Sequence, residues 1–209
     1  MLTFRRNLIV AVLFLGVFTL PMSAAPAKAE DVGKGAEKFI SNMADQAINA
    51  LTTPGIDAEE RSERFRKLLN ENFAVNTIGR WVLGRYWNKA SKVEKKEYLQ
   101  LFEQMLISTY VDRFSKYSGE QLKILKSLPN GKSDAVVYSE IVRTNSEPSI
   151  HVDWRVRSKK DTYKIIDVMV EGVSMGQTQR SEFASVIRQN GGKLEGLLKE
   201  LRKRVSKSA

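Results

Sequence analysis

The sequence contains no cysteine and only one histidine, His151, in 209 residues. The lack of cysteine excludes disulfide bonds, thiolate metal sites, iron–sulfur clusters, a cysteine nucleophile and the lipid-modified cysteine of a bacterial lipoprotein. A single histidine cannot build a multi-histidine metal site and disfavours a Ser-His-Asp triad. Most familiar enzyme classes are therefore disfavoured, and we expect no metal site.

Long apolar runs are also scarce, because the only one extends from Leu8 to Leu20. It is shorter than the roughly 20 residues that a transmembrane helix needs. An Arg5-Arg6 pair precedes it, and Ala27-Lys28-Ala29 follows with the small-x-small pattern of a signal peptidase site. We predict a secretory signal peptide over residues 1–29 and a soluble domain over residues 30–209.

Acidic residues are fewer than basic ones: the sequence has 24 Asp and Glu and 34 Lys and Arg, which gives a formal net charge of +10. For an exported protein this excess indicates anionic lipid or an acidic partner surface rather than nucleic acid. An evenly solvated positive surface is the alternative. One candidate docking surface is the cationic run Arg155, Arg157, Lys159 and Lys160.

The first half of the sequence has helical periodicity. Apolar residues recur at helical spacing from Val32 to Leu51, and Asp57 has the spacing of an N-cap before a second helix. Ser91 and Glu94 form a capping box that opens a long helix ending near Lys116. Two more amphipathic helices are expected after Gly172.

Between these helices the period changes to two, which is typical of strands. Strands are expected at residues 122–125, 136–142, 150–156 and 163–170. Placing residue 153 opposite residue 167 puts Val152 and Trp154 beside Ile166 and Val168 on one apolar face. Helices that flank an antiparallel meander predict a single α+β domain.

Two carboxylates on the polar face of the last hairpin, Asp153 and Asp167, are the best candidates for acid–base catalysis, with His151 and Glu171 nearby. Ion pairing with Arg155 and Arg157 is the favoured interpretation. The run Gly-Val-Ser-Met-Gly at 172–176 matches a nucleophile elbow, but no histidine follows it, so either the match is chance or Ser174 is a helix N-cap.

Apolar residues are in surplus around residues 81–87, on the long helix and on the strand around Trp154. An ordinary core explains any one of them. As a set they are compatible with an open wedge between a curved sheet and its helices, which is a common location for a ligand pocket.

Three stretches resemble one known family. They are Val-Leu-Gly-Arg-Tyr-Trp at 82–87, the strand with Asp153-Trp154, and Val-Glu-Gly-Val-Ser-Met at 170–175 followed by Gln-Arg-Ser-Glu-Phe at 179–183. Together they are similar to the MlaC family of periplasmic phospholipid-binding proteins, also known as toluene-tolerance auxiliary proteins. The similarity extends from about Phe39 to Leu201.

The resemblance implies an NTF2-like domain in the periplasm of a Gram-negative bacterium, with a curved antiparallel sheet covered by helices. It implies a carrier without catalytic residues or cofactor that holds phospholipid acyl chains in a pocket. The implied partners are an inner-membrane ABC transporter with an MCE-domain subunit and an outer-membrane lipoprotein–porin complex, between which a monomer carries lipid to maintain outer-membrane asymmetry. A hopanoid-associated branch and an NTF2-like enzyme using Asp153 or Asp167 stay alternatives.

The residues expected to line the pocket follow from periodicity rather than from the resemblance. They are Val82, Leu83, Tyr86, Trp87, Phe102, Met105, Leu106, Tyr110, Val152, Trp154, Val168, Val170, Val173 and Met175.

Overall fold

A computed structural model describes residues 27–115, 117–145, 147–160 and 162–207. The predicted signal peptide lies outside these residues, except that the first helix, α1 (Ala27–Leu51), includes its last three. Within the described ranges, no helix combines the length and the apolar character that crossing a membrane requires.

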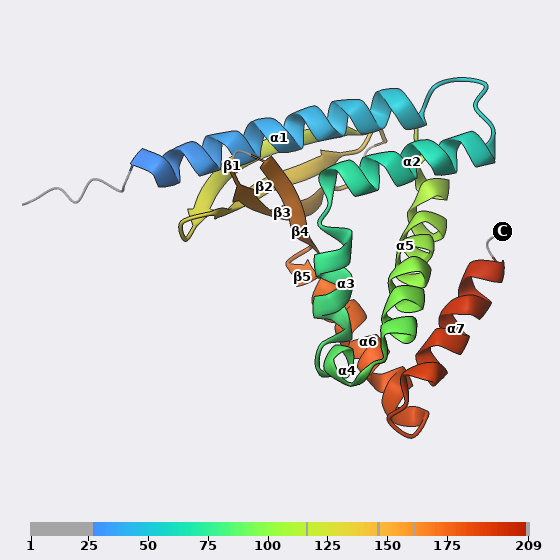
Figure 1. Cartoon of the computed structure of the whole chain (residues 1–209). Coiled ribbons are helices and arrows are strands. Elements are labelled where there is room, and N and C mark those ends of the chain that lie inside the picture. Colours follow the sequence, from blue (N-terminus) through green and yellow to red (C-terminus); the bar gives the residue numbers. More distant parts are fainter. Residues whose placement is uncertain (1–26, 116, 146, 161, 208–209) are drawn as a thin grey trace, which may run out of the picture.

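The structure has a sheet with α1 along it and a layer of helices to one side (Figure 1). The sheet is antiparallel in the order β1-β2-β3-β4-β5, and its strands are β1 (Gln121–Asn130), β2 (Asp134–Val142), β3 (Ile150–Lys159), β4 (Thr162–Val170) and β5 (Val173–Ser174). The remaining helices are α2 (Ala58–Asn72), α3 (Val75–Leu83), α4 (Arg85–Lys89), α5 (Lys92–Ser115), α6 (Met175–Gln189) and α7 (Leu194–Lys207). The α+β prediction is confirmed.

The predicted helix starts are also confirmed by their capping hydrogen bonds. The Asp57 carboxylate accepts from the backbone N–H of Glu60 at 2.8 Å. The backbone N–H of Ser91 donates to the Glu94 carboxylate at 2.8 Å, and the backbone N–H of Glu94 donates to Ser91 Oγ at 3.2 Å, which completes the capping box. Ser174 Oγ accepts from the N–H of Gln177 at 3.0 Å, so Ser174 is an N-cap.

The predicted register between β3 and β4 is wrong by two residues at one end. Asp153 pairs with Met169, and Trp154 pairs with Val168. A β-bulge between Arg155 and Val156 inserts Ile166 as the unpaired residue. Val152 and Trp154 still share a face with Val168, but Ile166 is not their cross-strand neighbour.

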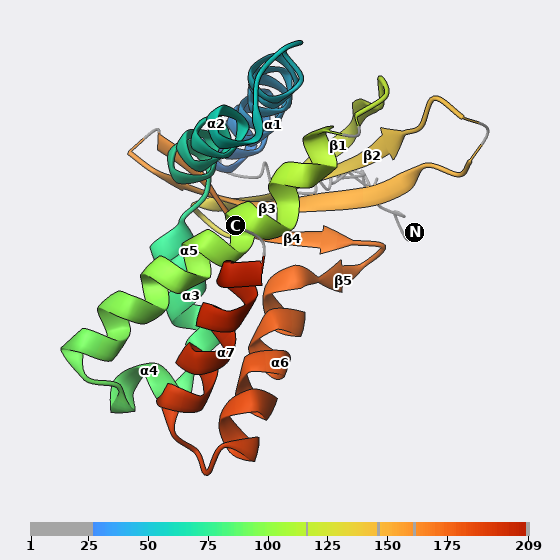
Figure 2. The ribbon, with the colours of Figure 1, turned by 90° about the vertical axis from the view of Figure 1, so that its right-hand side faces the viewer.

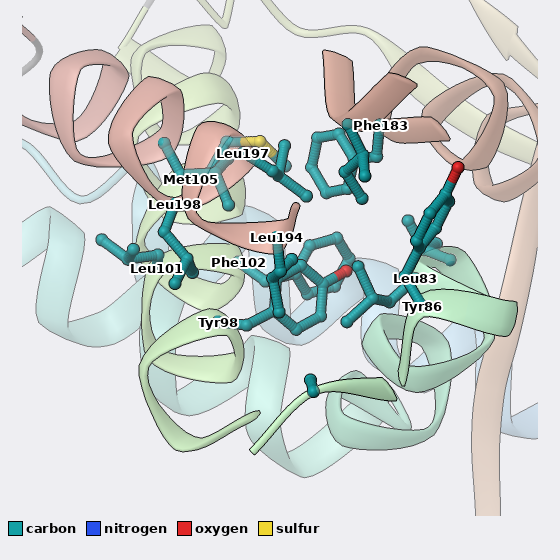
Figure 3. Close-up of a cluster of buried hydrophobic side chains, with 14 of the residues drawn as sticks. Leu83, Tyr86, Tyr98, Leu101, Phe102, Met105, Phe183, Leu194, Leu197 and Leu198 are labelled. Atoms are coloured by element: carbon teal, nitrogen blue, oxygen red, sulfur yellow. The ribbon is translucent and has the colours of Figure 1, made fainter. Parts of the chain in front are cut away.

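The helix layer has its own core, in which side chains from α3 to α7 meet. Figure 3 shows Phe102 and Tyr98 of α5 pointing toward Phe183 of α6 and the leucines of α7. Phe183 makes edge contacts with Tyr98 and Phe102 at centroid distances of 6.2 and 6.3 Å. Burial raises the pKa of the Tyr98 phenol above its ordinary value, and its hydroxyl donates to the Gly79 carbonyl at 3.0 Å.

α7 closes this layer beside α5 and α6 (Figure 2). The basic residues at its C-terminal end are held by ion pairs. Arg202 pairs with Glu97 at 2.6 Å and with Glu195 at 2.7 Å, while Arg204 pairs with Glu182 at 2.7 Å. These ion pairs continue the helix to Lys207.

α1 packs on the sheet through a second apolar cluster. Val32, Ala36 and Ile40 meet Ala135 and Val137 of β2 there. The approach is close, because a Cβ atom built on Gly35 would lie 2.0 Å from Tyr163 Oη. Glycine therefore lets the Tyr163 ring of β4 lie directly against the helix backbone.

Candidate functional site

The face of the sheet toward α1, called here the inner face, carries the strand residues that the sequence analysis proposed. Val137, which packs with α1, pairs with Trp154, and Trp154 pairs with Val168. The next row contains Val152 and Val170. Since paired residues project to the same side, all four proposed strand residues, Val152, Trp154, Val168 and Val170, lie on the inner face.

Trp154 is held in place on the inner face by a buried hydroxyl. Its indole Nε1 donates to Ser139 Oγ at 3.0 Å, and Ser139 Oγ donates to the carbonyl of Val152 at 2.5 Å. Ser139 is completely buried, so this chain satisfies a polar group that would otherwise be costly. The ring itself is only half-buried, as is the Val168 side chain. The inner face therefore presents ordered apolar surface that the protein does not fully cover.

Two adjoining hollows open between α1 and the edge strand β1, with volumes of about 460 and 360 Å³. They share Ser41 of α1 and Leu122 and Ile124 of β1. These volumes fall in the range of ligand pockets, although α1 lines the larger hollow with polar side chains and β1 contributes its apolar ones. Ser41, Leu122 and Ile124 were not proposed as site residues.

The floor of these hollows is continuous with the inner face. Ile124 pairs with Ser139, which pairs with Val152, which pairs with Val170. This row joins the hollows to two of the proposed residues. The sequence signal was weak, because a second β-bulge, between Ile124 and Lys126, interrupts the alternation of β1.

The proposed helix residues lie elsewhere, in the helix-layer core. Leu83, Tyr86, Phe102 and Met105 point into it beside Leu197 (Figure 3). Val82 is buried in the same core, Trp87 and Leu106 pack at its margin, and Tyr110 is half-buried on α5. The structure thus places the strand set and the helix set in two apolar clusters, and Phe73 packs against both.

Val173 and Met175 lie at the junction from β5 to α6. Val173 is 54% exposed and Met175 is half-buried. The junction is a tight structural unit, because Glu171 and Gly172 both have positive φ angles, of 49° and 75°. The Glu171 carboxylate also accepts from the backbone N–H of His151 at 2.7 Å.

Asp167 fastens this junction to β4. Its carboxylate accepts from Ser174 Oγ at 2.7 Å, from the N–H of Gly176 at 3.1 Å and from the N–H of Val168 at 3.0 Å. The side chain is buried and does not face Asp153, whose cross-strand partner is Met169. This geometry assigns Asp167 a structural role.

The expected pairing of Arg157 is corrected as well. Arg157 binds Asp134 of β2 with two hydrogen bonds, at 2.8 and 2.7 Å, rather than Asp153 or Asp167. These bonds lower the pKa of Asp134 below its ordinary value. No group of three metal-binding side chains occurs in the part of the chain that the structure describes.

The fold and the site define an α+β protein with an incompletely covered apolar sheet face beside an amphipathic helix. A family model described as "MlaC protein" matches residues 41–203, and the chain belongs to this family. Over 116 residues it is 22% identical to the intermembrane phospholipid transport system binding protein MlaC of Haemophilus influenzae. That match spans about half of each chain, 54% in both cases.

A solved structure shares the fold. The phospholipid-binding protein from Ralstonia solanacearum, determined in complex with a phospholipid, superposes with a TM-score of 0.71. The sequences are 20% identical, and the match covers 83% of this chain and 98% of the other.

Proposed function

We propose that this protein binds a phospholipid and holds its acyl chains against the inner face of the sheet. The observation that carries the proposal is the pair of half-buried apolar residues Trp154 and Val168, which lie one row away from the strand residues that reach the hollows beside α1. Membership of the MlaC family and the likeness to a phospholipid-binding fold support it.

In this proposal the protein is a periplasmic carrier that takes lipid between an inner-membrane ABC transporter with an MCE-domain subunit and an outer-membrane lipoprotein–porin complex. The result is maintenance of outer-membrane lipid asymmetry. The name of the Haemophilus influenzae relative, an intermembrane phospholipid transport protein, supports this role. Export by a signal peptide over residues 1–29 is part of the same proposal.

Physical chemistry explains why such a carrier is needed. Transfer of about 30 methylenes from water to an apolar site is favourable by on the order of 25 kcal/mol, so a free phospholipid almost never crosses an aqueous compartment. A bilayer supplies nearly the same free energy as the protein site does. Exchange between bilayer and carrier is therefore close to neutral, and the kinetic barrier at the membrane controls the transfer.

The carrier requires no chemistry from Asp153 or Asp167, and the proposal does not include catalysis. A general base needs a carboxylate oxygen that can reach its substrate. The three donors around Asp167 instead direct its oxygens to the β5–α6 junction.

Native mass spectrometry of protein purified without detergent tests this function. We expect co-purifying species with phospholipid masses in the wild type and in Asp153→Asn. Asp167→Asn is expected to keep its lipid but to lose about 1–2 kcal/mol of stability, because a charged hydrogen-bond acceptor at a helix start is weakened.

Two results would oppose the carrier. A protein that is always empty but tightly bound to another chain would be an adaptor. Loss of outer-membrane integrity in Asp153→Asn, with lipid still bound, would support an enzyme.

A further inference from the structure

The far end of the helix layer carries a concentration of positive charge. Figure 1 shows α4 and the start of α5 at the end of this layer that lies away from α1. We call the cationic side chains of α3, α4, the first turns of α5 and the facing part of α6 the cationic tip. Its members are Arg80, Arg85, Lys89, Lys92, Lys95, Lys96 and Arg180.

These cations differ from the other basic residues of the helix layer in their partners. On α7, Arg202 and Arg204 are each paired with two glutamates. No member of the cationic tip has a carboxylate within 4.0 Å among the residues that the structure describes. The two acids in the first turns of α5 have other partners, because Glu94 is used in the capping box and Glu97 pairs with Arg202 of α7.

Aromatic rings take the place of acids at the tip. Arg180 lies over the Trp81 ring at 5.0 Å, and both Arg80, at 5.2 Å, and Lys95, at 5.5 Å, lie over the Trp87 ring. A guanidinium that stacks on a ring still directs N–H groups outward in its plane, where they can bind a phosphate. Trp81 is 44% exposed, so the surface is both cationic and apolar.

This combination fits a lipid surface better than an acidic protein. Tryptophan and arginine are also common at protein interfaces, but a protein partner would need a surface shaped to fit this patch. At a membrane, tryptophan rings lie at the level of the headgroups, while lysine and arginine attract anionic lipid. A protruding tip can also meet a flat surface without a matching groove.

We infer that the cationic tip is a docking surface for anionic phospholipid headgroups, through which the protein rests transiently on a bilayer. The contact is with the membrane and not with the cargo, so it goes beyond the proposed function. Trp81 also connects the tip to the sheet. Its ring packs against Gly176, since a Cβ atom built on that glycine would lie 3.2 Å from Trp81 Cζ3. The backbone N–H of Gly176 in turn donates to the Asp167 carboxylate of β4. Docking therefore orients the sheet relative to the bilayer.

Co-sedimentation with vesicles tests the inference, using phosphatidylcholine alone or phosphatidylcholine mixed with phosphatidylglycerol. The tip variant is Arg80→Glu with Lys89→Glu, two exposed side chains. The matched comparison is Lys159→Glu with Lys160→Glu, which changes the net charge equally on the exposed β3–β4 turn, the docking surface that the sequence analysis offered instead. Thermal unfolding checks that both variants keep a cooperative transition.

We expect the wild type to bind mixed vesicles at low salt, and to release them at high salt because the charges are screened. The tip variant should bind at least about tenfold more weakly, since each cation near an anionic surface contributes severalfold to binding. The comparison variant should differ from the wild type by less than about threefold, an effect of long-range charge alone. The fluorescence of Trp81 is obtained by subtracting the emission spectrum of Trp81→Phe from that of the wild type. It should shift to shorter wavelength when mixed vesicles are added.

Three results would overturn the inference. They are no binding of the wild type to mixed vesicles, an equal loss in the tip and comparison variants, and Trp81 emission that vesicles do not change. The first, combined with tip-dependent binding to an acidic protein, would reassign the tip to a protein partner. Because lipid occupancy is measured separately, failure here leaves the proposed carrier function standing.

Discussion

The two apolar clusters of this protein differ in how completely they are covered. In the helix layer, Phe183, Leu198 and Leu201 are at most 1% exposed, because α7 closes over α5 and α6. On the inner face of the sheet, Trp154 and Val168 stay half-buried, one row away from the residues that reach the hollows beside α1. Half-buried apolar side chains lie at the margin of both clusters, but the two hollows beside α1 adjoin the second.

This difference separates stability from binding. A closed core contributes free energy of folding through every buried side chain. A half-covered apolar face contributes less to the free energy of folding. The surface that it leaves exposed can gain further free energy when a ligand buries it. In the proposed function, the helix layer therefore supplies most of the folding stability and the inner face binds the cargo.

The largest expected effect is that of removing a ring from the helix layer. Phe183→Ala should cost about 3–5 kcal/mol, because Tyr98 and Phe102 lose their central contact and a cavity remains. Urea denaturation measures this loss. A cost below about 1 kcal/mol would mean that the layer is not a close-packed core.

Met105 sharpens the comparison, because it was proposed from periodicity as a pocket residue and lies 6% exposed in the helix-layer core. Met105→Trp should overpack that core and cost about 1–3 kcal/mol, with bound lipid per folded molecule unchanged. Denaturation and native mass spectrometry give the two quantities. A lower amount of bound lipid, with an unchanged free energy of unfolding, would instead show that Met105 lines the lipid pocket.

The smallest expected effect concerns the Asp134–Arg157 pair, which is partly exposed on the β2–β3 hairpin. Arg157 lowers the pKa of Asp134 in the folded state, so the pair stabilises the fold above the unfolded pKa of about 3.9. The stabilisation disappears as the pH falls through the lower folded pKa. Asp134→Asn should cost about 0.5–1 kcal/mol at neutral pH.

Denaturation of wild type and Asp134→Asn across an acid pH series checks this sign. The difference in stability between them should shrink toward zero at the acid end. A difference that grows with acidity would show that the pair does not stabilise the fold through ionised Asp134.

Local signals in the sequence predicted much of the fold. The capping spacings at Asp57, Ser91 and Ser174 are satisfied within three residues of the chain, so they needed no tertiary information. Strand alternation likewise predicted that Val152, Trp154 and Val168 share a face. These features depend only on residues close in the sequence or on the alternation of side chains between the two faces of a strand.

Features set by distant contacts were not predictable in this way. The two β-bulges shift the strand register, but no residue type or spacing in the sequence indicates where they occur. The hollows require α1 to pass beside β1, more than seventy residues later in the chain. The order at the end of α7 depends on Glu97 of α5 and Glu182 of α6, which no local pattern connects with Arg202 and Arg204.

The most direct test of the central claim is the lipid content of two matched variants of the sheet. Val168→Trp fills the inner face, whereas Val136→Trp places the same ring on the opposite face, since Val136 alternates with Ala135 and Val137. Native mass spectrometry should show that Val168→Trp loses most of its phospholipid while Val136→Trp retains the wild-type amount. Equal lipid in both variants, with both folded, would contradict the assignment of the acyl chains to the inner face.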